Sequence, residues 1–378
     1  MAVTETTTIG WGSRLGASFK GILTGIILFT VGFPVLFWNE GRAVKATKTN
    51  DEGAASVVEA QPGAVDPSQN GKLVHVIGEA ATKDVLKDDA YGVAETAIKL
   101  EKKTEMFQWV EEKTVEDVKK LGGKIERKTT YSYSKEWCDR PVSSDGFKEG
   151  GHINPPAQIA LGDAAQQAKN VTLGARRLTD SQISRIGGAS HLKTMYKPVA
   201  TNEFFEITGT VPDPKVGDVR VTFSVVRPHT VTVVAAQNGD SFMAYTAKTG
   251  STISHVMEGA VDAAGVFAAA ERGNTIITWF LRFIGFFLML IGVRMVFGPL
   301  QVLSDVVPII GKIVGFGIGA VAFLIAAPCA LVTIAVAWLF YRPLLAALLI
   351  AAAVGIVVAV VAMVRKRRAA APAAPVAD

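Results

Sequence analysis

The sequence predicts an α+β membrane protein with four transmembrane helices and a large β-rich extracytoplasmic domain inserted between the first and second helices. Three observations lead to this fold class. Hydrophobic residues make up 49% of the 378 residues. They are concentrated at 21–38 and from about 276 to 364. The stretch between these two regions has mixed charge, many turn-forming residues and the alternation of apolar and polar positions that is typical of half-buried strands.

The chain begins with a polar segment and one apolar run. Residues 1–20 are expected to be a cytoplasmic N-terminal tail, and the threonine-rich first twelve residues to be disordered. Residues 21–38 predict the first transmembrane helix, about 27 Å long and near the minimum for crossing a bilayer. A cleavable signal peptide is the alternative. It is disfavoured because the run is long and is followed by the charged residues Glu40 and Arg42.

The region 39–272 predicts the β-rich domain. Alternating segments predict strands at 73–79, 98–110, 124–137, 203–211, 219–226, 230–236 and 241–246. Short helices are expected at 156–168 and 178–186. Residues 73–78 and 204–209 resemble each other, which suggests two related β units, although chance explains so short a match equally well.

The C-terminal third predicts the remaining membrane helices. The expected order is a second span at 276–297, a short cytoplasmic interfacial segment at 298–312, a third span at 313–341, a fourth span at 343–364 and a basic, then disordered, tail at 365–378. The third run is about 43 Å long as a helix, so it must tilt or protrude. Pro328 favours a kink within it.

Topology follows from the four consecutive basic residues at 365–368, directly after the last span. Basic residues next to a span favour the cytoplasm, so both termini are expected there and the domain on the other side. A multi-pass protein is therefore expected. In a bacterium it would lie in the inner membrane with its domain in the periplasm.

Two features of the spans are candidates for holding the helices together. Glu40 and Arg282 lie at span ends on the same expected side, so they are a candidate ion pair, with simple interfacial anchoring as the alternative. Small residues spaced four apart let helices approach closely, within one chain or between chains. The candidate packing positions are Gly21, Gly25, Gly315 and Gly319.

No pattern for catalysis, cofactor binding or metal binding appears, so no enzyme activity, cofactor or metal is expected. The five histidines are scattered, without metal-ligand spacing. Cys138 and Cys329 lie in different environments, which disfavours an intrachain disulfide and leaves an intermolecular one at Cys138 open. The net charge of +5 does not form a basic stripe, so nucleic acid is not an expected partner.

The exit of the first span carries a recognisable motif, Asn39-Glu40-Gly41-Arg42. With its flanks at 36–44 it resembles the transmembrane protein 43 family, also called LUMA, and the similarity extends from about Trp11 to Val364. The alanine- and valine-rich composition favours a bacterial member. Further matches are Gln108-Trp109-Val110-Glu111, His152-Ile153-Asn154-Pro155, Gly217-Asp218-Val219-Arg220-Val221, and Gly298-Pro299-Leu300 with Asp305, Pro308 and Gly311.

The resemblance implies a four-span protein whose first loop is luminal, with no established enzymatic residues. The resemblance also implies that a eukaryotic member would lie in the endoplasmic reticulum or inner nuclear membrane. Eukaryotic members self-associate and are linked to membrane protein complexes that include lamins and emerin, partners that are not expected to transfer to a bacterium. The leading hypothesis is a non-enzymatic scaffold, a homo-oligomer that organises membrane protein complexes or membrane patches. Its expected partners are membrane lipids and other membrane proteins. The alternatives are a lipid-binding or envelope-stress sensor that uses the β-rich domain and, less favoured because no acid lies at mid-membrane depth, a channel or transporter.

Overall fold

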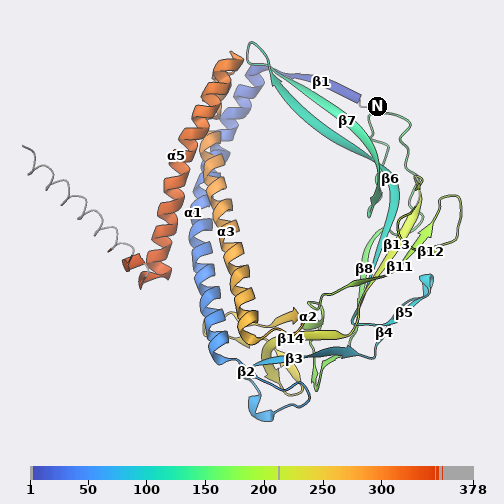
Figure 1. Cartoon of the computed structure of the whole chain (residues 1–378). Helices are drawn as coiled ribbons and strands as arrows, with labels where there is room; N and C mark the ends of the chain where they lie inside the picture. Colours follow the sequence, from blue (N-terminus) through green and yellow to red (C-terminus); the bar gives the residue numbers. More distant parts are fainter. Residues whose placement is uncertain (1–2, 212, 345, 349–350, 352–378) are drawn as a thin grey trace, which may run out of the picture. The chain divides into compact units, whose positions relative to one another are not determined.

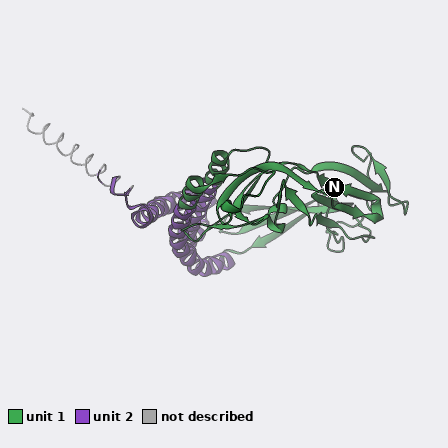
Figure 2. Ribbon diagram, turned by 90° about the horizontal axis from the view of Figure 1, so that it is seen from below, with its two compact units in different colours: residues 1–11, 47–273 green, residues 12–46, 274–378 purple. Residues whose placement is uncertain are grey.

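The computed structural model describes residues 3–211, 213–344, 346–348 and 351. The chain divides into two compact units, coloured separately in Figure 2. The first, called the β unit, consists of Met1–Trp11 and Thr47–Gly273. The second, called the helical unit, consists of Gly12–Ala46 and Asn274–Asp378. The apolar runs of the sequence and the β-sheets thus belong to separate units.

One seven-stranded sheet of the β unit is built around a long hairpin, visible in Figure 1. Its order is β1 (Val3–Ile9), β7 (Ile125–Cys138), β6 (Lys99–Lys119), β13 (Val219–Val226), β11 (Ser190–Lys197) and β12 (Phe205–Ile207), and β8 (Gly162–Gln167) also pairs with β6. Strand β13 shows why the sheet forms. Val219, Val221, Phe223 and Val225 alternate with polar residues and are buried in one core, beside the hairpin of β4 (Val85–Asp88) and β5 (Val93–Thr96).

The second seven-stranded sheet surrounds the other large core of the β unit. Its order is β18 (His255–Glu258), β14 (His229–Asn238), β15 (Ser241–Met243), β10 (Arg176–Arg177), β9 (Val171–Leu173), β3 (Leu73–Thr82) and β2 (Val58–Glu59), and β14 also pairs with β3. That last pairing closes β14, β15, β10, β9 and β3 into a ring. Strand β14 is buried on both faces, which explains its continuous apolar sequence.

The remaining small elements of the β unit are η1 (Pro67–Gln69), η2 (Asp89–Tyr91), α2 (Asp180–Ile183), β16 (Tyr245–Thr246) and β17 (Thr252–Ile253). Helix α2 begins with a capping box in which Thr179 and Gln182 satisfy each other's backbone N–H groups. A helix was expected at 178–186, and this short turn lies within that range. At 156–168 the expected helix is absent, and β8 forms instead because its edge position beside β6 supplies backbone partners.

Three helices are long and apolar enough to cross a membrane among the described residues. They are α1 (Trp11–Ser56), α3 (Ala263–Val296) and α5 (Pro308–Tyr341), and the short α4 (Gly298–Ser304) precedes α5. Helices α1 and α5 contain the expected spans 21–38 and 313–341, and α3 covers the expected span 276–297 except for Phe297. Most of the fourth expected span, 343–364, and all of the tail 365–378 lie outside the described residues. Large apolar side chains remain exposed on these helices, as lipid contact would require, among them Leu23, Phe280, Phe316 and Leu331.

Helix α1 is much longer than the expected span 21–38. It has 46 residues and continues to Ser56, so the β unit resumes at Thr47 inside a helix rather than at residue 39. The segment after Arg42 contains four alanines and two lysines, which are good helix formers, and no proline ends it before Ser56.

The N-terminal segment forms a strand where a disordered tail was expected. Strand β1 pairs antiparallel with β7, from Val3 opposite Tyr131 to Ile9 opposite Ile125. Its threonines have high β propensity, and the free edge of β7 supplies the backbone partners. The β6–β7 turn contacts Trp11, since a Cβ added to Gly123 would lie 2.2 Å from the Trp11 ring. Gly123 also has φ of +73°, which favours glycine.

The two segments that resemble each other in sequence occupy unlike positions. Residues 73–78 belong to the ten-residue strand β3 inside the second sheet. Of residues 204–209, only Phe205–Ile207 forms a strand, at the edge of the first sheet. Short apolar alternation recurs in any sheet protein, so their similarity reflects strand formation rather than equivalent placement.

Candidate functional site

The Asn-Glu-Gly-Arg motif lies on α1 within the helical unit, and its Glu40 side chain is fully buried. The structure brings Glu40 and Arg282 together in a bidentate ion pair. Arg282 Nε donates to Glu40 Oε1 at 2.6 Å and Nη2 donates to Oε2 at 2.9 Å. The indole N–H of Trp338 on α5 donates to the same Oε2 at 2.9 Å. One carboxylate therefore joins α1, α3 and α5.

The two neighbouring motif residues hold α1 against α3. Asn39 Nδ2 donates to the carbonyl of Thr278 at 2.9 Å. Arg42 donates to Asn274 Oδ1 at 3.1 Å and to Thr278 Oγ1 at 2.8 Å. Asn274 Nδ2 in turn donates to the Ala43 carbonyl at 3.1 Å. Every polar motif side chain is thus used to connect helices.

Gly41 completes the motif because no larger residue fits there. A Cβ at this position would lie 2.6 Å from the Tyr341 ring. Elsewhere in the helical unit, Arg14 of α1 forms an ion pair with Asp305, whose side chain is fully buried next to Gly311. Two buried carboxylates therefore join α1 to other helices of the unit, and breaking such a pair is costly.

The small-residue positions behave differently from one another. A Cβ on Gly25 would lie 2.6 Å from the Gly292 carbonyl of α3, so α1 and α3 are in close backbone contact there. Gly21 is near only the end of Met295, at 3.7 Å. A Cβ on Gly315 would lie 3.1 Å from the Gln301 side chain, and a Cβ on Gly319 would have nothing within 4 Å.

Two other family-like motifs meet in the β unit where the long hairpin leaves the sheet. Asn154 Oδ1 accepts the Trp109 backbone N–H at 2.7 Å, and its Nδ2 donates to the Trp109 carbonyl at 2.9 Å. Gln108 Nε2 donates to the Arg140 carbonyl at 2.9 Å, and its Oε1 accepts the Val142 N–H at 2.8 Å. The loop after β7 is thereby fixed onto β6 by side chains that act as backbone partners.

A third motif supports the same junction. Buried Asp218 accepts hydrogen bonds from the Tyr196 hydroxyl and from the Val199 N–H, the latter at 2.7 Å. Burial, followed by the hydrogen bond to Asp218, raises the pKa of Tyr196. Gly217 has φ of +99°, and a Cβ there would lie 2.9 Å from Pro155. The junction is densely packed, and the small pocket that Pro155, Val199 and Gly217 help to line has a volume of only about 20 Å³.

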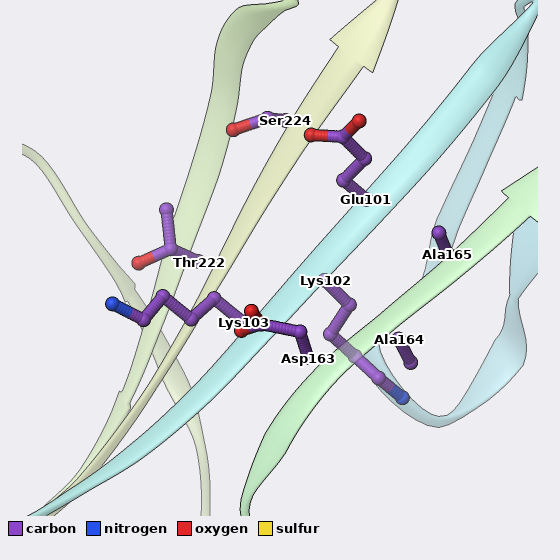
Figure 3. Close-up of a pocket in the computed structure, with 8 residues that line it drawn as sticks. All are labelled: Glu101, Lys102, Lys103, Asp163, Ala164, Ala165, Thr222 and Ser224. Carbon is purple, nitrogen blue, oxygen red and sulfur yellow. The ribbon is translucent and has the colours of Figure 1, made fainter. Parts of the chain in front are cut away.

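A cleft with a volume of about 400 Å³ lies on the polar face of β6, β8 and β13 (Figure 3). Glu101, Lys103, Asp163, Thr222 and Ser224 line it. These side chains offer hydrogen-bond donors and acceptors of both charge signs over a floor of small residues. The cleft can therefore hold a polar ligand, but its charges favour no single ligand class.

A buried carboxylate lies beside this cleft. Glu105 accepts from Arg220 Nε at 2.7 Å and from Lys103 Nζ at 3.0 Å. Burial alone would raise the pKa of Glu105, but these two hydrogen bonds outweigh it and hold the pKa below the ordinary value of 4.5. Glu105 is therefore an ionised structural group rather than a proton donor near neutral pH.

No group of three His, Cys, Asp or Glu residues that could hold a metal ion occurs among the described residues. His75 is buried between Glu59, at 2.7 Å from Nδ1, and the Val261 carbonyl, at 2.8 Å from Nε2. Cys138 is a free, half-buried thiol whose pKa is raised by burial and by nearby carboxylates. This direction disfavours the reactive thiolate form.

Sequence reasoning missed most of these partners. Trp338, Asn274 and Thr278 carried no motif, and only their helical spacing on α3 and α5 could have placed them near the span exit. Asn154 was noted only as part of a family-like motif, although a side-chain amide can satisfy one backbone N–H and one carbonyl together.

Comparison with known proteins identifies the relatives of this chain. The family model described as Transmembrane protein 43 matches residues 106–343. Transmembrane protein 43 of Rattus norvegicus is 35% identical over 365 residues, covering 92% of this chain and 91% of the relative. The protein of that name in Homo sapiens is 34% identical over 358 residues, covering 90% and 89%. The Drosophila melanogaster homolog is 29% identical over 343 residues, covering 87% and 91%. No solved structure matches the chain.

Proposed function

Because the chain belongs to the transmembrane protein 43 family, we propose that it is a non-enzymatic integral membrane scaffold that self-associates and organises membrane protein complexes. The observation that carries the proposal is an open strand edge on β6. Membrane lipids and other membrane proteins are its expected partners, and the β unit is expected outside the cytoplasm.

The open edge begins where β6 leaves β13. The Phe107 N–H bonds the Asp218 carbonyl, and the Phe107 carbonyl accepts from Gly217, so odd-numbered residues of β6 direct their backbone groups away from β7. The backbone N–H and carbonyl of Trp109 also point away from β7, where the Asn154 side chain bonds both of them. Beyond it, no other strand of the described residues pairs with this edge as far as Lys119.

An unprotected strand edge is a template for pairing with another chain. This one follows Trp109 on β6 and comprises the outward-facing backbone groups of Glu111, Lys113 and Val115, and the Val115 side chain is also exposed. A second copy offers the same edge, and two identical edges can pair antiparallel with two-fold symmetry. Self-association through β6 would use the outward-facing backbone groups of Glu111, Lys113 and Val115, with which no strand of the described residues pairs.

The absence of an enzymatic role is supported by how the polar motif residues are used. Glu40, Asn154 and Asp218 each accept or donate several hydrogen bonds within the fold. A catalytic group must keep an atom within reach of a substrate. These groups are instead buried or occupied, so their chemistry stabilises the structure.

The test uses the full chain in lipid nanodiscs or mild detergent, with its mass measured by mass photometry over a concentration series. Val115→Pro removes an edge N–H that faces away from β7, so the hairpin should remain intact while self-association is lost. Val115→Ala keeps that N–H and is the matched control, expected to associate as wild type does. A wild-type protein that stays monomeric at every concentration refutes the proposal.

A second candidate is a ligand sensor that uses the β unit, favoured by the cleft of about 400 Å³ on its polar face. Ordered lipid-like density in that cleft would support it. A channel or transporter has less support, because the buried carboxylates of Glu40 on α1 and of Asp305 between α4 and α5 form ion pairs with arginine rather than lining a path.

A further inference from the structure

A second cleft of the β unit lies between α2, the end of β15 and the β17–β18 connection, and has a volume of about 350 Å³. That volume is at the lower end of the range for small-molecule sites, about 300–1,000 Å³. No carboxylate lines it. Its polar lining consists of an arginine, a histidine, an amide and four hydroxyl-bearing residues, Thr179, Ser181, Thr252 and Ser254.

The arginine in this cleft is held in place by neutral groups. Arg185 Nη1 donates to the Ser254 carbonyl at 2.5 Å, and Nη2 donates to Ser181 Oγ at 3.3 Å. Among the described residues it forms no ion pair with a carboxylate. A guanidinium has five N–H donors, so three are left for a ligand, and its positive charge is not neutralised by a neighbour.

His255 faces the same cleft, and no described group bonds its ring nitrogens. Burial and the nearby Arg185 charge lower its pKa, while the Phe267 ring on its other side carries no charge. Without a ligand, His255 therefore remains neutral near pH 7. An anion bound between Arg185 and His255 would raise the pKa of His255 instead.

We propose that this cleft binds the phosphate group of a small phosphorylated molecule. The guanidinium of Arg185 provides the forked donor that phosphate oxygens prefer, and the hydroxyls of Ser181 and Thr252 provide neutral donors. His255 gains a proton when the anion binds and becomes a further charged donor. The site goes beyond a scaffold role, because it would make the β unit responsive to a ligand.

The test uses the full chain in nanodiscs of zwitterionic lipid, titrated with glycerol 3-phosphate by calorimetry. Arg185→Gln is expected to weaken binding about tenfold or more, since a charged hydrogen bond is lost. Arg177→Gln is the matched control, because Arg177 is also exposed but pairs with Asp240 and does not line the cleft. It is expected to bind as wild type does.

A second readout follows the ring signals of His255 by NMR. Ligand binding should raise its pKa in the wild type and leave it unchanged in Arg185→Gln. The same signals in nanodiscs that contain phosphatidic acid, without soluble ligand, tell whether a lipid headgroup is the phosphate source, which would equally support the site. The proposal is overturned if neither phosphate source shifts His255, or if the two arginine variants lose affinity equally.

Discussion

The ion pair between Glu40 and Arg282 offers the sharpest test of how the helical unit is stabilised. Glu40 accepts three N–H groups, two from Arg282 and one from Trp338. Glu40→Gln keeps the side-chain shape but leaves the guanidinium without a charged partner. Removing one member of a buried pair costs about 3–5 kcal/mol. At 2–4 °C per kcal/mol, the midpoint of thermal unfolding should fall by about 10 °C.

The assay is thermal unfolding of the nanodisc-embedded chain at a fixed lipid-to-protein ratio. Arg294→Gln is the control, because Arg294 is an exposed arginine on α3, the helix of Arg282, and forms no ion pair among the described residues. It should change the midpoint by no more than about 1–2 °C, as expected for a surface substitution. A midpoint for Glu40→Gln equal to that of the control would refute the reasoning.

Exchanging the two charges separates the ion pair from the tryptophan contact. The double variant Glu40→Arg with Arg282→Glu restores the pair, so it should be more stable than either single variant. It should not reach wild-type stability, because an arginine at position 40 cannot accept the Trp338 N–H. Adding Trp338→Phe should cost about 1 kcal/mol in the wild type and little in the exchanged background. An exchange no more stable than the single variants would contradict this account.

Three further predictions concern other positions. Gly25→Leu should destabilise the helical unit by about 1–3 kcal/mol because the added side chain meets the α3 backbone, whereas Gly319→Leu points into open space and should be close to neutral in thermal unfolding. Glu105→Gln should cost about 2 kcal/mol at pH 7, where the carboxylate bonded to Arg220 is ionised in the folded state. Folding lowers the pKa of Glu105, so the stability difference between wild type and Glu105→Gln should be complete at pH values above 4.5, the ordinary pKa of a glutamate. It should disappear as the pH falls through the pKa of Glu105 in the folded state. Denaturant titrations at several pH values measure this difference. At pH 7.5, a thiol reagent should label Cys138 more slowly in the folded protein than in the unfolded chain, because the pKa of this thiol is raised. The pH at which labelling becomes fast should be higher for Cys138 than for an ordinary thiol.

The sequence was sufficient to predict those elements that are specified by the pattern of their own residues. Strand β13 forms at 219–226, as its strict alternation predicts, and the three described membrane helices contain the expected apolar runs. The pattern failed where a neighbour decides the structure. Within the segment 156–168, Gly162–Gln167 became strand β8 because β6 offered an edge, and the N-terminal segment became β1 because β7 did.

The candidate sites show the same division. Glu40 and Arg282 could be proposed as a pair from sequence because both lie at span ends on the same expected side of the membrane. Arg185 and His255 could not, because the residues between them form several strands and only the tertiary fold brings them to one cleft. Side chains that bond backbone groups, such as Asn154, carry no spacing signal at all.

Strand β1 has a consequence for how the polypeptide enters the bilayer. Hydrogen-bonded strands occupy one aqueous compartment, yet β1 precedes the apolar stretch 21–38 and β7 follows it. A bilayer crossing by that stretch alone would place the two strands on opposite sides. The β6–β7 ribbon is too highly charged to follow through lipid itself. A chain in which β1 pairs with β7 therefore differs from a chain in which residues 21–38 have crossed the bilayer. A disulfide between cysteines placed at the paired positions Thr6 and Lys128 would show which of these two states a given chain has reached.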